Sequence, residues 1–276
     1  MLEQYELEGQ IGEGGFSRVY VGRHLLLQRK AAIKVIPCKY LDVARKEAQF
    51  YARRVSDALP LLYDVFLQEG NVFLVQEYVE GKSLKLLIRE GMSLSFVREV
   101  SLQIAVFLKQ LHGHVPPIAY LDLKPENLIL EPGGRLRVLD MGTAVFIGGE
   151  QSGCFAGTNG YAPAAQKLGK RPEVSWDLYA FAVLLREMLT GDRRESIPAD
   201  DPANAVANGS ANALAEGSVY APEVIPREYQ NLMKQCKSGV LTDGASLLSA
   251  LQAMEKDPAY SIIKSFRCCE FPRNLL

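Results

Sequence analysis

The chain has 276 residues, and its 31 lysines and arginines nearly balance 32 aspartates and glutamates, giving a net charge of −1. This balance argues against a duplex DNA-binding function carried by net charge alone. A composition that is 48% hydrophobic and 23% charged excludes a disordered chain.

The first eighty residues favour β-strands. Apolar residues alternate or run together in five short segments, and a glycine-rich break at 12–15 separates the first two as in an antiparallel hairpin. Residues 41–55 are polar, rich in alanine and free of glycine and proline, so we predict a helix there. The predicted strands are 5–10, 17–22, 31–36, 61–68 and 71–78.

After Gly81 the sequence changes to helical periodicity. Ser93 or Ser95 is expected to cap the helix that follows. The stretch 199–218 is rich in small and polar residues and is expected to be a surface loop. The predicted helices are 83–89, 94–111, 176–189, 227–236 and 245–255, with short strands at 128–130 and 136–139.

No segment of the sequence has the length and hydrophobicity of a membrane span. The longest apolar run, 178–185, ends at Arg186, and the N-terminal residues are acidic and lack an apolar core. Five scattered cysteines do not form a disulfide pattern, and Cys268 and Cys269 lack metal-ligand spacing. We therefore expect a cytoplasmic protein in a reducing compartment.

Glycines occupy positions 12, 14 and 15, between the first two predicted strands. Because glycine has no side chain, its backbone N–H groups can approach a phosphate chain closely. A purely structural turn explains the same pattern. A dinucleotide-binding turn does not, since a strand and not a helix follows the glycines.

Lys34 follows the apolar run Ala31-Ala32-Ile33. Burying its ammonium group is costly unless the group meets an anion, so a nucleotide phosphate and the carboxylate of Glu47 are its natural partners. Taken alone, a strand-end lysine that reaches solvent is the simpler interpretation.

Residues 120–130 (YLDLKPENLIL) carry the most informative chemistry. Lys124 follows Asp122 by two residues and Asn127 follows it by five, while Asp140 lies thirteen residues after Asn127. The Asp122 carboxylate can accept a proton. The oxygens of Asn127 and Asp140 suit a hard cation such as Mg²⁺.

Together these stretches resemble the eukaryotic-type protein kinases, whose motifs are a glycine loop, V-A-I-K, H-R-D-L-K-P-E-N and D-F-G. The resemblance runs in the family's order from Tyr5 to about Glu255 and is strongest to bacterial serine/threonine kinase domains. It implies an α+β, bilobal fold. A small lobe of five antiparallel strands and one helix would span 1–78, a hinge 79–82, and a larger, mainly helical lobe 83–276, all within one kinase domain.

The resemblance also implies roles for individual residues. Asp122 would be the catalytic base, with Lys124 serving the transferred phosphate. Lys34, paired with Glu47, would contact the α- and β-phosphates, and Asn127 and Asp140 would hold Mg²⁺. The implied ATP-binding residues are Gly12, Gly14, Val19, Ala32, Lys34, Glu77, Val79 and Ile129, with Glu77 and Val79 acting through their backbone.

Further positions resemble the family's supporting residues. Gln76 would stand at the entrance to a back pocket, and Asp177 would anchor the catalytic loop from a central helix. Gly157-Thr158 and Tyr161 would end the activation segment, where a peptide docks.

The sequence also departs from the family pattern. Leu121 replaces the arginine that receives an activation-loop phosphate, so we predict activity without phosphorylation of that loop. Ala165 replaces a glutamate, and its arginine partner is also missing from 239–243; the loss of both charges can be nearly neutral. Met141 replaces a phenylalanine and can fill the same apolar slot.

We therefore predict an ATP- and Mg²⁺-dependent protein serine/threonine kinase. Its expected partners are protein substrates, with no nucleic acid and no membrane segment in this chain, while the sequence does not define an oligomeric state. One alternative is a pseudokinase that binds nucleotide or a partner without transfer, suggested by Ala165 and the atypical stretch 200–218. Another is a small-molecule kinase of the aminoglycoside or choline type, which shares the spacing of Asp122 and Asn127.

Overall fold

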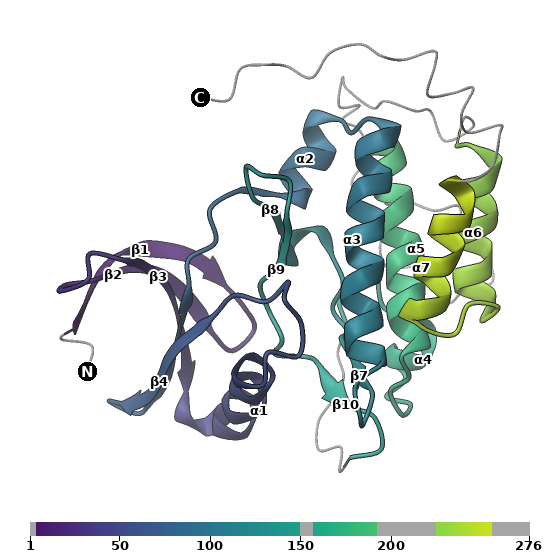
Figure 1. Cartoon of the computed structure of the whole chain (residues 1–276). Coiled ribbons are helices and arrows are strands. Elements are labelled where there is room, and N and C mark those ends of the chain that lie inside the picture. Colours follow the sequence, from purple (N-terminus) through teal and green to yellow (C-terminus); the bar gives the residue numbers. More distant parts are fainter. Residues whose placement is uncertain (1–3, 150–156, 192–224, 256–276) are drawn as a thin grey trace, which may run out of the picture.

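The computed structural model describes residues 4–149, 157–191 and 225–255. A five-stranded antiparallel sheet and helix α1 (Leu41–Ala52) form one lobe, and a larger lobe is mainly helical (Figure 1). The expected α+β, bilobal fold is therefore confirmed. The expectations for 199–218, Cys268 and Cys269 concern positions outside the described residues.

The small-lobe sheet has the strand order β1-β2-β3-β5-β4. All five predicted strands are confirmed, with shifted ends. The first strand was expected to break at Gly12, but Gly12 still pairs with Val19, because irregularities in β1 carry it on to Glu13. The strands are β1 (Tyr5–Glu13), β2 (Arg18–His24), β3 (Lys30–Pro37), β4 (Leu62–Gln68) and β5 (Asn71–Glu77).

Helix α1 follows a short 3-10 turn, η2 (Cys38–Tyr40), and buries one face that includes Glu47, Phe50 and Tyr51. It was predicted to reach residue 55, but it ends at Ala52. Arg54 adopts a φ of 48°, which an α-helix cannot accommodate. The following loop turns toward the other lobe, where the N–H of Val138 donates to the Ala58 carbonyl at 2.9 Å.

The large lobe contains all five predicted helices with small shifts of their ends. Ser83 and Ser93 cap α2 and α3, since their hydroxyls accept from the N–H groups of Leu86 and Phe96. The helices are α2 (Leu84–Glu90), α3 (Leu94–His112), α4 (Ala164–Lys167), α5 (Ser175–Thr190), α6 (Arg227–Ser238) and α7 (Gly244–Glu255).

Short strands complete this lobe. Strands β6, β8 and β9 form a small three-stranded sheet in that order, and β7 pairs with β10. The two-residue strands and α4 were missed, because they are too short to show periodicity. These elements are β6 (Lys82–Ser83), β7 (Ile118–Ala119), the 3-10 turn η3 (Pro125–Asn127), β8 (Leu128–Leu130), β9 (Leu136–Val138) and β10 (Val145–Phe146).

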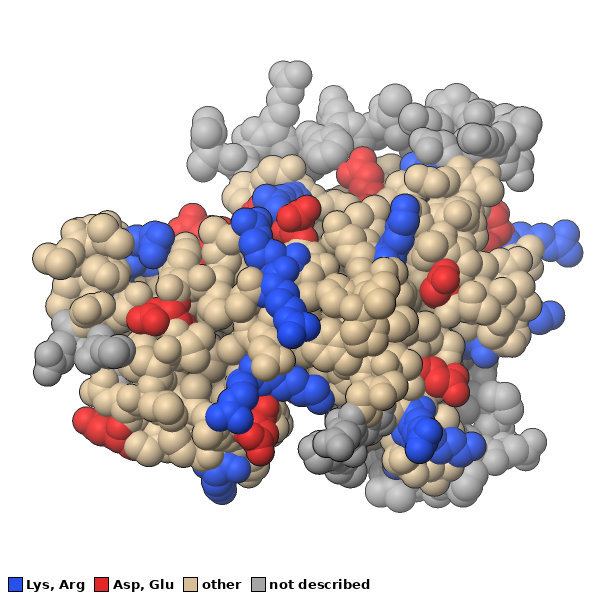
Figure 2. All heavy atoms as spheres, turned by 60° about the horizontal axis from the view of Figure 1, so that its bottom comes forward, with Lys and Arg blue, Asp and Glu red and all other residues tan. Residues whose placement is uncertain are grey.

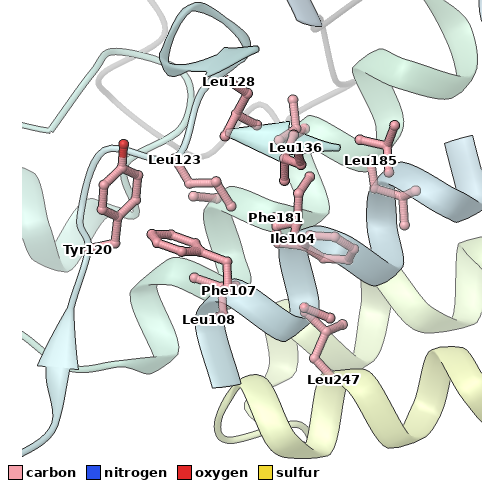
Figure 3. Close-up of a cluster of buried hydrophobic side chains, with 14 of the residues drawn as sticks. Ile104, Phe107, Leu108, Tyr120, Leu123, Leu128, Leu136, Phe181, Leu185 and Leu247 are labelled. Atoms are coloured by element: carbon pink, nitrogen blue, oxygen red, sulfur yellow. The ribbon is translucent and has the colours of Figure 1, made fainter. Parts of the chain in front are cut away.

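The main hydrophobic core surrounds α5. Phe107 and Leu108 of α3, Phe181 of α5 and Leu247 of α7 are nearly or fully buried in one cluster (Figure 3). Tyr120, Leu123 and Leu128 belong to the same cluster. The loop that carries Asp122 is therefore fixed on both sides by residues packed into the core.

The surface between the lobes is rich in basic groups. Figure 2 shows Lys and Arg side chains gathered in a band where the lobes meet, with acidic side chains interspersed. Asp57 lies in the loop between α1 and β4, where its carboxylate contacts Arg54 and its carbonyl oxygen accepts from Arg135 of the large lobe. No helix within the described residues is long and apolar enough to cross a bilayer.

The central position of Phe181 predicts a large cost for its truncation. Phe181→Ala should lower the free energy of unfolding by about 3–5 kcal/mol, because it removes buried contacts and leaves a cavity. Chemical denaturation measures this change. Leu168→Ala is the control, since Leu168 is 74% exposed. A Phe181→Ala protein as stable as the control would contradict this packing.

Candidate active site

A cleft of about 690 Å³ lies between the two lobes. It brings together residues that the sequence separates by more than a hundred positions. The predicted residues that line it are Gly12, Gly14, Val19, Ala32, Lys34, Glu77, Val79, Lys124, Asn127, Ile129 and Asp140. Glu47 and Asp122 lie directly behind them, hydrogen-bonded to Lys34 and to Asn127.

One end of the cleft has apolar walls. Val19 and Ala32 line it from the sheet, and Ile129 lines it from β8. Glycine is required at position 81, because a Cβ there would lie 2.2 Å from the Leu130 carbonyl oxygen. Other lining residues, including Ile11, Pro60 and Leu139, were missed, since apolar residues of this kind carry no recognisable motif.

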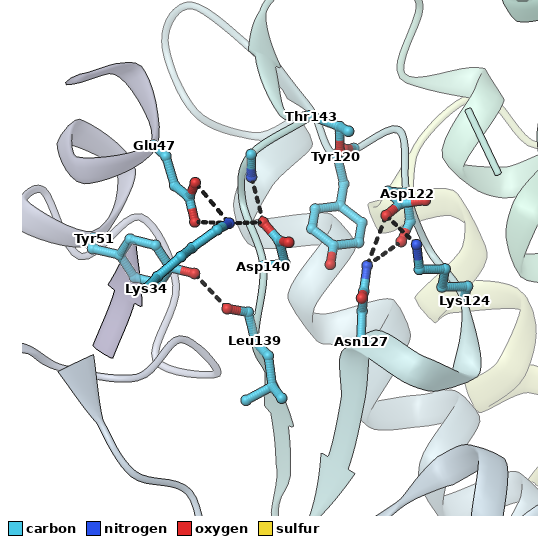
Figure 4. Close-up of polar contacts among 11 residues, drawn as sticks. Lys34, Glu47, Tyr51, Tyr120, Asp122, Lys124, Asn127, Leu139, Asp140 and Thr143 are labelled. Atoms are coloured by element: carbon cyan, nitrogen blue, oxygen red, sulfur yellow. Dashed lines mark hydrogen bonds and ion pairs between the residues drawn. The ribbon is translucent and has the colours of Figure 1, made fainter. Parts of the chain in front are cut away.

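At the other end, the Lys34 ammonium lies between two carboxylates (Figure 4). Its Nζ is 2.7 and 2.9 Å from the two Glu47 oxygens and 2.9 Å from Asp140 Oδ1. Lys34 is 6% exposed. The interpretation of Lys34 as a solvent-facing lysine is therefore wrong, because both carboxylates hold it inside the protein.

These contacts determine the charges at this end of the cleft. Burial would lower the pKa of Lys34, but Glu47 and Asp140 outweigh burial and raise it. Burial would raise the pKa of Asp140, but Lys34 and the Gly142 N–H hold it below its usual value. Burial raises the pKa of Glu47 to about 7. The ammonium and the Asp140 carboxylate are thus both charged at neutral pH.

Tyr51 fixes helix α1 relative to Asp140. Its hydroxyl donates to the carbonyl oxygen of Leu139 at 2.6 Å, from a side chain that is almost fully buried. The same helix carries Glu47 one turn earlier. Helix α1 is therefore joined to the segment that presents Asp140 by one direct hydrogen bond and, through Glu47, by the Lys34 ammonium that also contacts Asp140.

Both oxygens of Asp122 are occupied. Thr158 donates its hydroxyl to Oδ1 at 2.6 Å, while the Lys124 ammonium at 2.7 Å and the Asn127 amide at 2.9 Å contact Oδ2. Lys124 also donates to the Thr158 hydroxyl oxygen at 3.0 Å. The sequence did not reveal that Thr158 contacts Asp122, because the two lie 36 residues apart.

Asp177 anchors the backbone just before Asp122. It is fully buried and accepts from the N–H groups of Tyr120 and Leu121, both at 2.7 Å. The His112 Nε2 lies 3.0 Å from the same carboxylate, and His112 Nδ1 accepts from the Gly244 N–H at 2.9 Å. Leu121 has a φ of 68°, a strained conformation that these contacts maintain.

Comparison with known proteins agrees with this arrangement. A family model described as the protein kinase domain matches residues 5–255. The chain belongs to the protein kinase domain family.

The relatives of this kinase domain include bacterial serine/threonine-protein kinases. A probable serine/threonine-protein kinase of Clostridium perfringens is 32% identical over 68% of this chain and 29% of its own length. One from Streptomyces coelicolor is 28% identical over 81% of this chain and 35% of its own length. PrkC of Bacillus subtilis is 27% identical over 68% of this chain and 30% of its own length. The kinase domain thus spans about a third of the length of these relatives.

The positions where this kinase domain departs from the family motifs are apolar. The Leu121 side chain is buried with Ala119, Val145 and Trp176, and Ala165 packs against the same cluster. Gln166 donates its amide to the Leu121 carbonyl at 3.0 Å and is itself buried. In 239–243, Leu241 joins the main core. Apolar packing therefore occupies the positions where the family motif carries charges.

The donors in the cleft fit a magnesium ion. The Asn127 amide nitrogen donates to the Asp122 carbonyl and carboxylate, both at 2.9 Å, which directs its own carbonyl oxygen away from Asp122. Asp140 lines the cleft with a half-exposed carboxylate. Within the described parts of the chain no cluster of three His, Cys, Asp or Glu side chains forms a protein-only metal site. Mg²⁺ takes few protein ligands and completes its shell with water and phosphate oxygens.

The Asp177 contacts predict how the loop that carries Asp122 responds to a small change. Asp177→Asn replaces one acceptor oxygen by an amide that faces N–H groups, so the free energy of unfolding should fall by about 1–3 kcal/mol. Hydrogen exchange at the Tyr120 and Leu121 amides should accelerate. Asp42→Asn is the control, because the Asp42 side chain is 95% exposed. Unchanged exchange at both amides would contradict the anchoring role.

Proposed function

We propose that this kinase domain transfers the γ-phosphate of ATP to serine and threonine hydroxyls of protein substrates. The observation that supports this most directly is the single cleft that gathers Lys34, Asp122, Lys124, Asn127 and Asp140. No covalent intermediate is needed for such a transfer, so positioning and charge compensation are the main tasks of the protein.

The apolar end of the cleft takes the adenine. Val19 and Ala32 cover the base, Ile129 supports it from below, and the backbone of Glu77 and Val79 bonds its edge. Gly12 and Gly14 cover the phosphates. Residues 79–82 are the hinge between a small lobe at 1–78 and a large lobe at 83–276.

The polar end performs the transfer. Lys34, held by Glu47, contacts the α- and β-phosphates. Asp122 orients the substrate hydroxyl and accepts its proton, and Lys124 compensates the charge that develops on the transferred phosphate. Mg²⁺ held by Asn127 and Asp140 would neutralise charge on the phosphate oxygens.

Three features favour this function over the alternatives. A pseudokinase would not need the contacts that hold Asp122 between Thr158, Lys124 and Asn127. Thr158 belongs to the segment that is expected to dock a peptide. Its contact with Asp122 therefore favours a protein substrate over a small-molecule substrate. The bacterial relatives carry serine/threonine-protein kinase names.

We also propose that the domain acts in the cytoplasm.

Transfer from labelled ATP with Mg²⁺, to the protein itself and to a basic protein substrate, tests the function. The wild type should label serine or threonine. Asp140→Ala should lose about a hundredfold or more of this rate, because a proposed metal ligand is gone. Asp42→Ala, which removes an exposed carboxylate, should behave as wild type. A folded wild type that binds ATP without transfer would favour the pseudokinase instead.

The apolar surroundings of Leu121 predict independence from loop phosphorylation. No cation stands at position 121 to receive a phosphate, so removal of every phosphate should change the transfer rate by no more than about twofold. Mass spectrometry verifies that the phosphatase-treated protein is unmodified. If that protein lost its activity and regained it on rephosphorylation, the prediction would be wrong.

A further inference from the structure

Arg137 in β9 is a buried charge that the proposed mechanism does not use. It is 4% exposed. Its Nη2 is 2.6 Å from Glu77 Oε2, and its Nη1 is 2.9 Å from Glu131 Oε1. Nη2 also donates to the Leu59 carbonyl at 3.2 Å. A buried guanidinium with these partners is fixed in one orientation.

Its main partner forms part of the cleft wall. Glu77 ends β5 and lines the cleft. The Glu77 N–H donates to the Leu61 carbonyl at 2.8 Å, and the Leu61 N–H donates to Glu77 Oε2 at 3.1 Å. Burial would raise the pKa of Glu77, but the hydrogen bonds from Arg137 and Leu61 outweigh it and lower the pKa. The Glu77 side chain is therefore a carboxylate at neutral pH, held by Arg137 and Leu61.

The backbone of Arg137 contacts a second wall of the cleft. Arg137 lies directly across from Ile129 in the β8–β9 pair. One residue thus connects the strand that carries Ile129 with the end of the strand that carries Glu77. These strands belong to different lobes, so the Arg137–Glu77 ion pair also sets the distance between the lobes at this end of the cleft.

We propose that Arg137 is a positioning residue for the nucleotide base. Its guanidinium holds Glu77 relative to Ile129, so that the backbone and apolar groups that bind adenine are arranged before the nucleotide arrives. This inference rests on the proposed function, because it takes adenine as the ligand of this end of the cleft. A prearranged site binds more tightly, since less ordering is needed on binding.

The shape of the side chain matters to this role. The planar guanidinium reaches two carboxylates and a carbonyl oxygen at once, which a single ammonium group cannot do with the same geometry. Arg137→Lys should therefore keep part of the effect through the Glu77 charge alone. Arg137→Met should lose it, while retaining a side chain of similar length.

Calorimetric titration with two probes separates this role from a general loss of structure. The probes are Mg·ADP, which has a base, and Mg·tripolyphosphate, which has none. Arg137→Met should weaken Mg·ADP binding by about tenfold and leave Mg·tripolyphosphate binding unchanged, because Lys34 and Asp140 are not disturbed. Arg137→Lys should fall between Arg137→Met and the wild type.

Two further variants complete the design. Arg135→Met is the matched control, because Arg135 is an exposed arginine two residues before Arg137 and contacts the Asp57 carbonyl instead. It should bind both probes as the wild type does. Glu77→Gln removes the carboxylate charge but retains the shape, and it should weaken Mg·ADP selectively even if Arg137→Met fails to fold.

In the transfer assay, Arg137→Met should raise the KM for ATP with little change in kcat. Equal weakening of both probes, or unchanged Mg·ADP binding in Arg137→Met and Glu77→Gln, would overturn the inference and leave the proposed function intact. A wild type that binds Mg·tripolyphosphate but not Mg·ADP would overturn both.

Discussion

The burial of the Lys34 ammonium imposes the strongest constraint on this structure. A charge that is removed from water needs nearby carboxylates, and here Glu47 of α1 and Asp140 after β9 supply them. Both elements must therefore approach β3 closely. Tyr51 adds a direct hydrogen bond from α1 to the Leu139 carbonyl, beside the connection that runs from Glu47 through Lys34 to Asp140.

A second buried carboxylate organises the other half of the cleft. Asp177 accepts two backbone N–H groups and contacts His112, and through His112 it is linked to the start of α7. The loop that carries Asp122 has no regular secondary structure to satisfy those N–H groups. A helix in the core therefore supplies the acceptors, which explains why an aspartate is tolerated in the middle of an apolar cluster.

Some positions that carry charges in the family motifs are apolar in this chain. Leu121 and Ala165 stand at motif positions that are charged in the family, and Leu241 lies in the segment that lacks the partner arginine; each packs against apolar neighbours. Replacing both members of a buried charge pair by apolar residues leaves no unpaired ion, so the surrounding structure is retained. Arg137 shows the opposite case, in which a buried cation is paired with the carboxylates of Glu77 and Glu131 and connects two lobes.

The sequence by itself determined the strands of the small lobe, the long helices and those cleft residues that belong to recognisable motifs, because periodicity and motif spacing can be read along the chain. It did not determine the end of α1, the two-residue strands, or the pairing of Lys34 with Asp140. The contacts of Thr158 with Asp122 and of Arg137 with Glu77 were also invisible. These contacts join residues that are distant in the chain. Packing between the lobes brings Lys34 to Asp140 and Arg137 to Glu77, and packing within the large lobe brings Thr158 to Asp122.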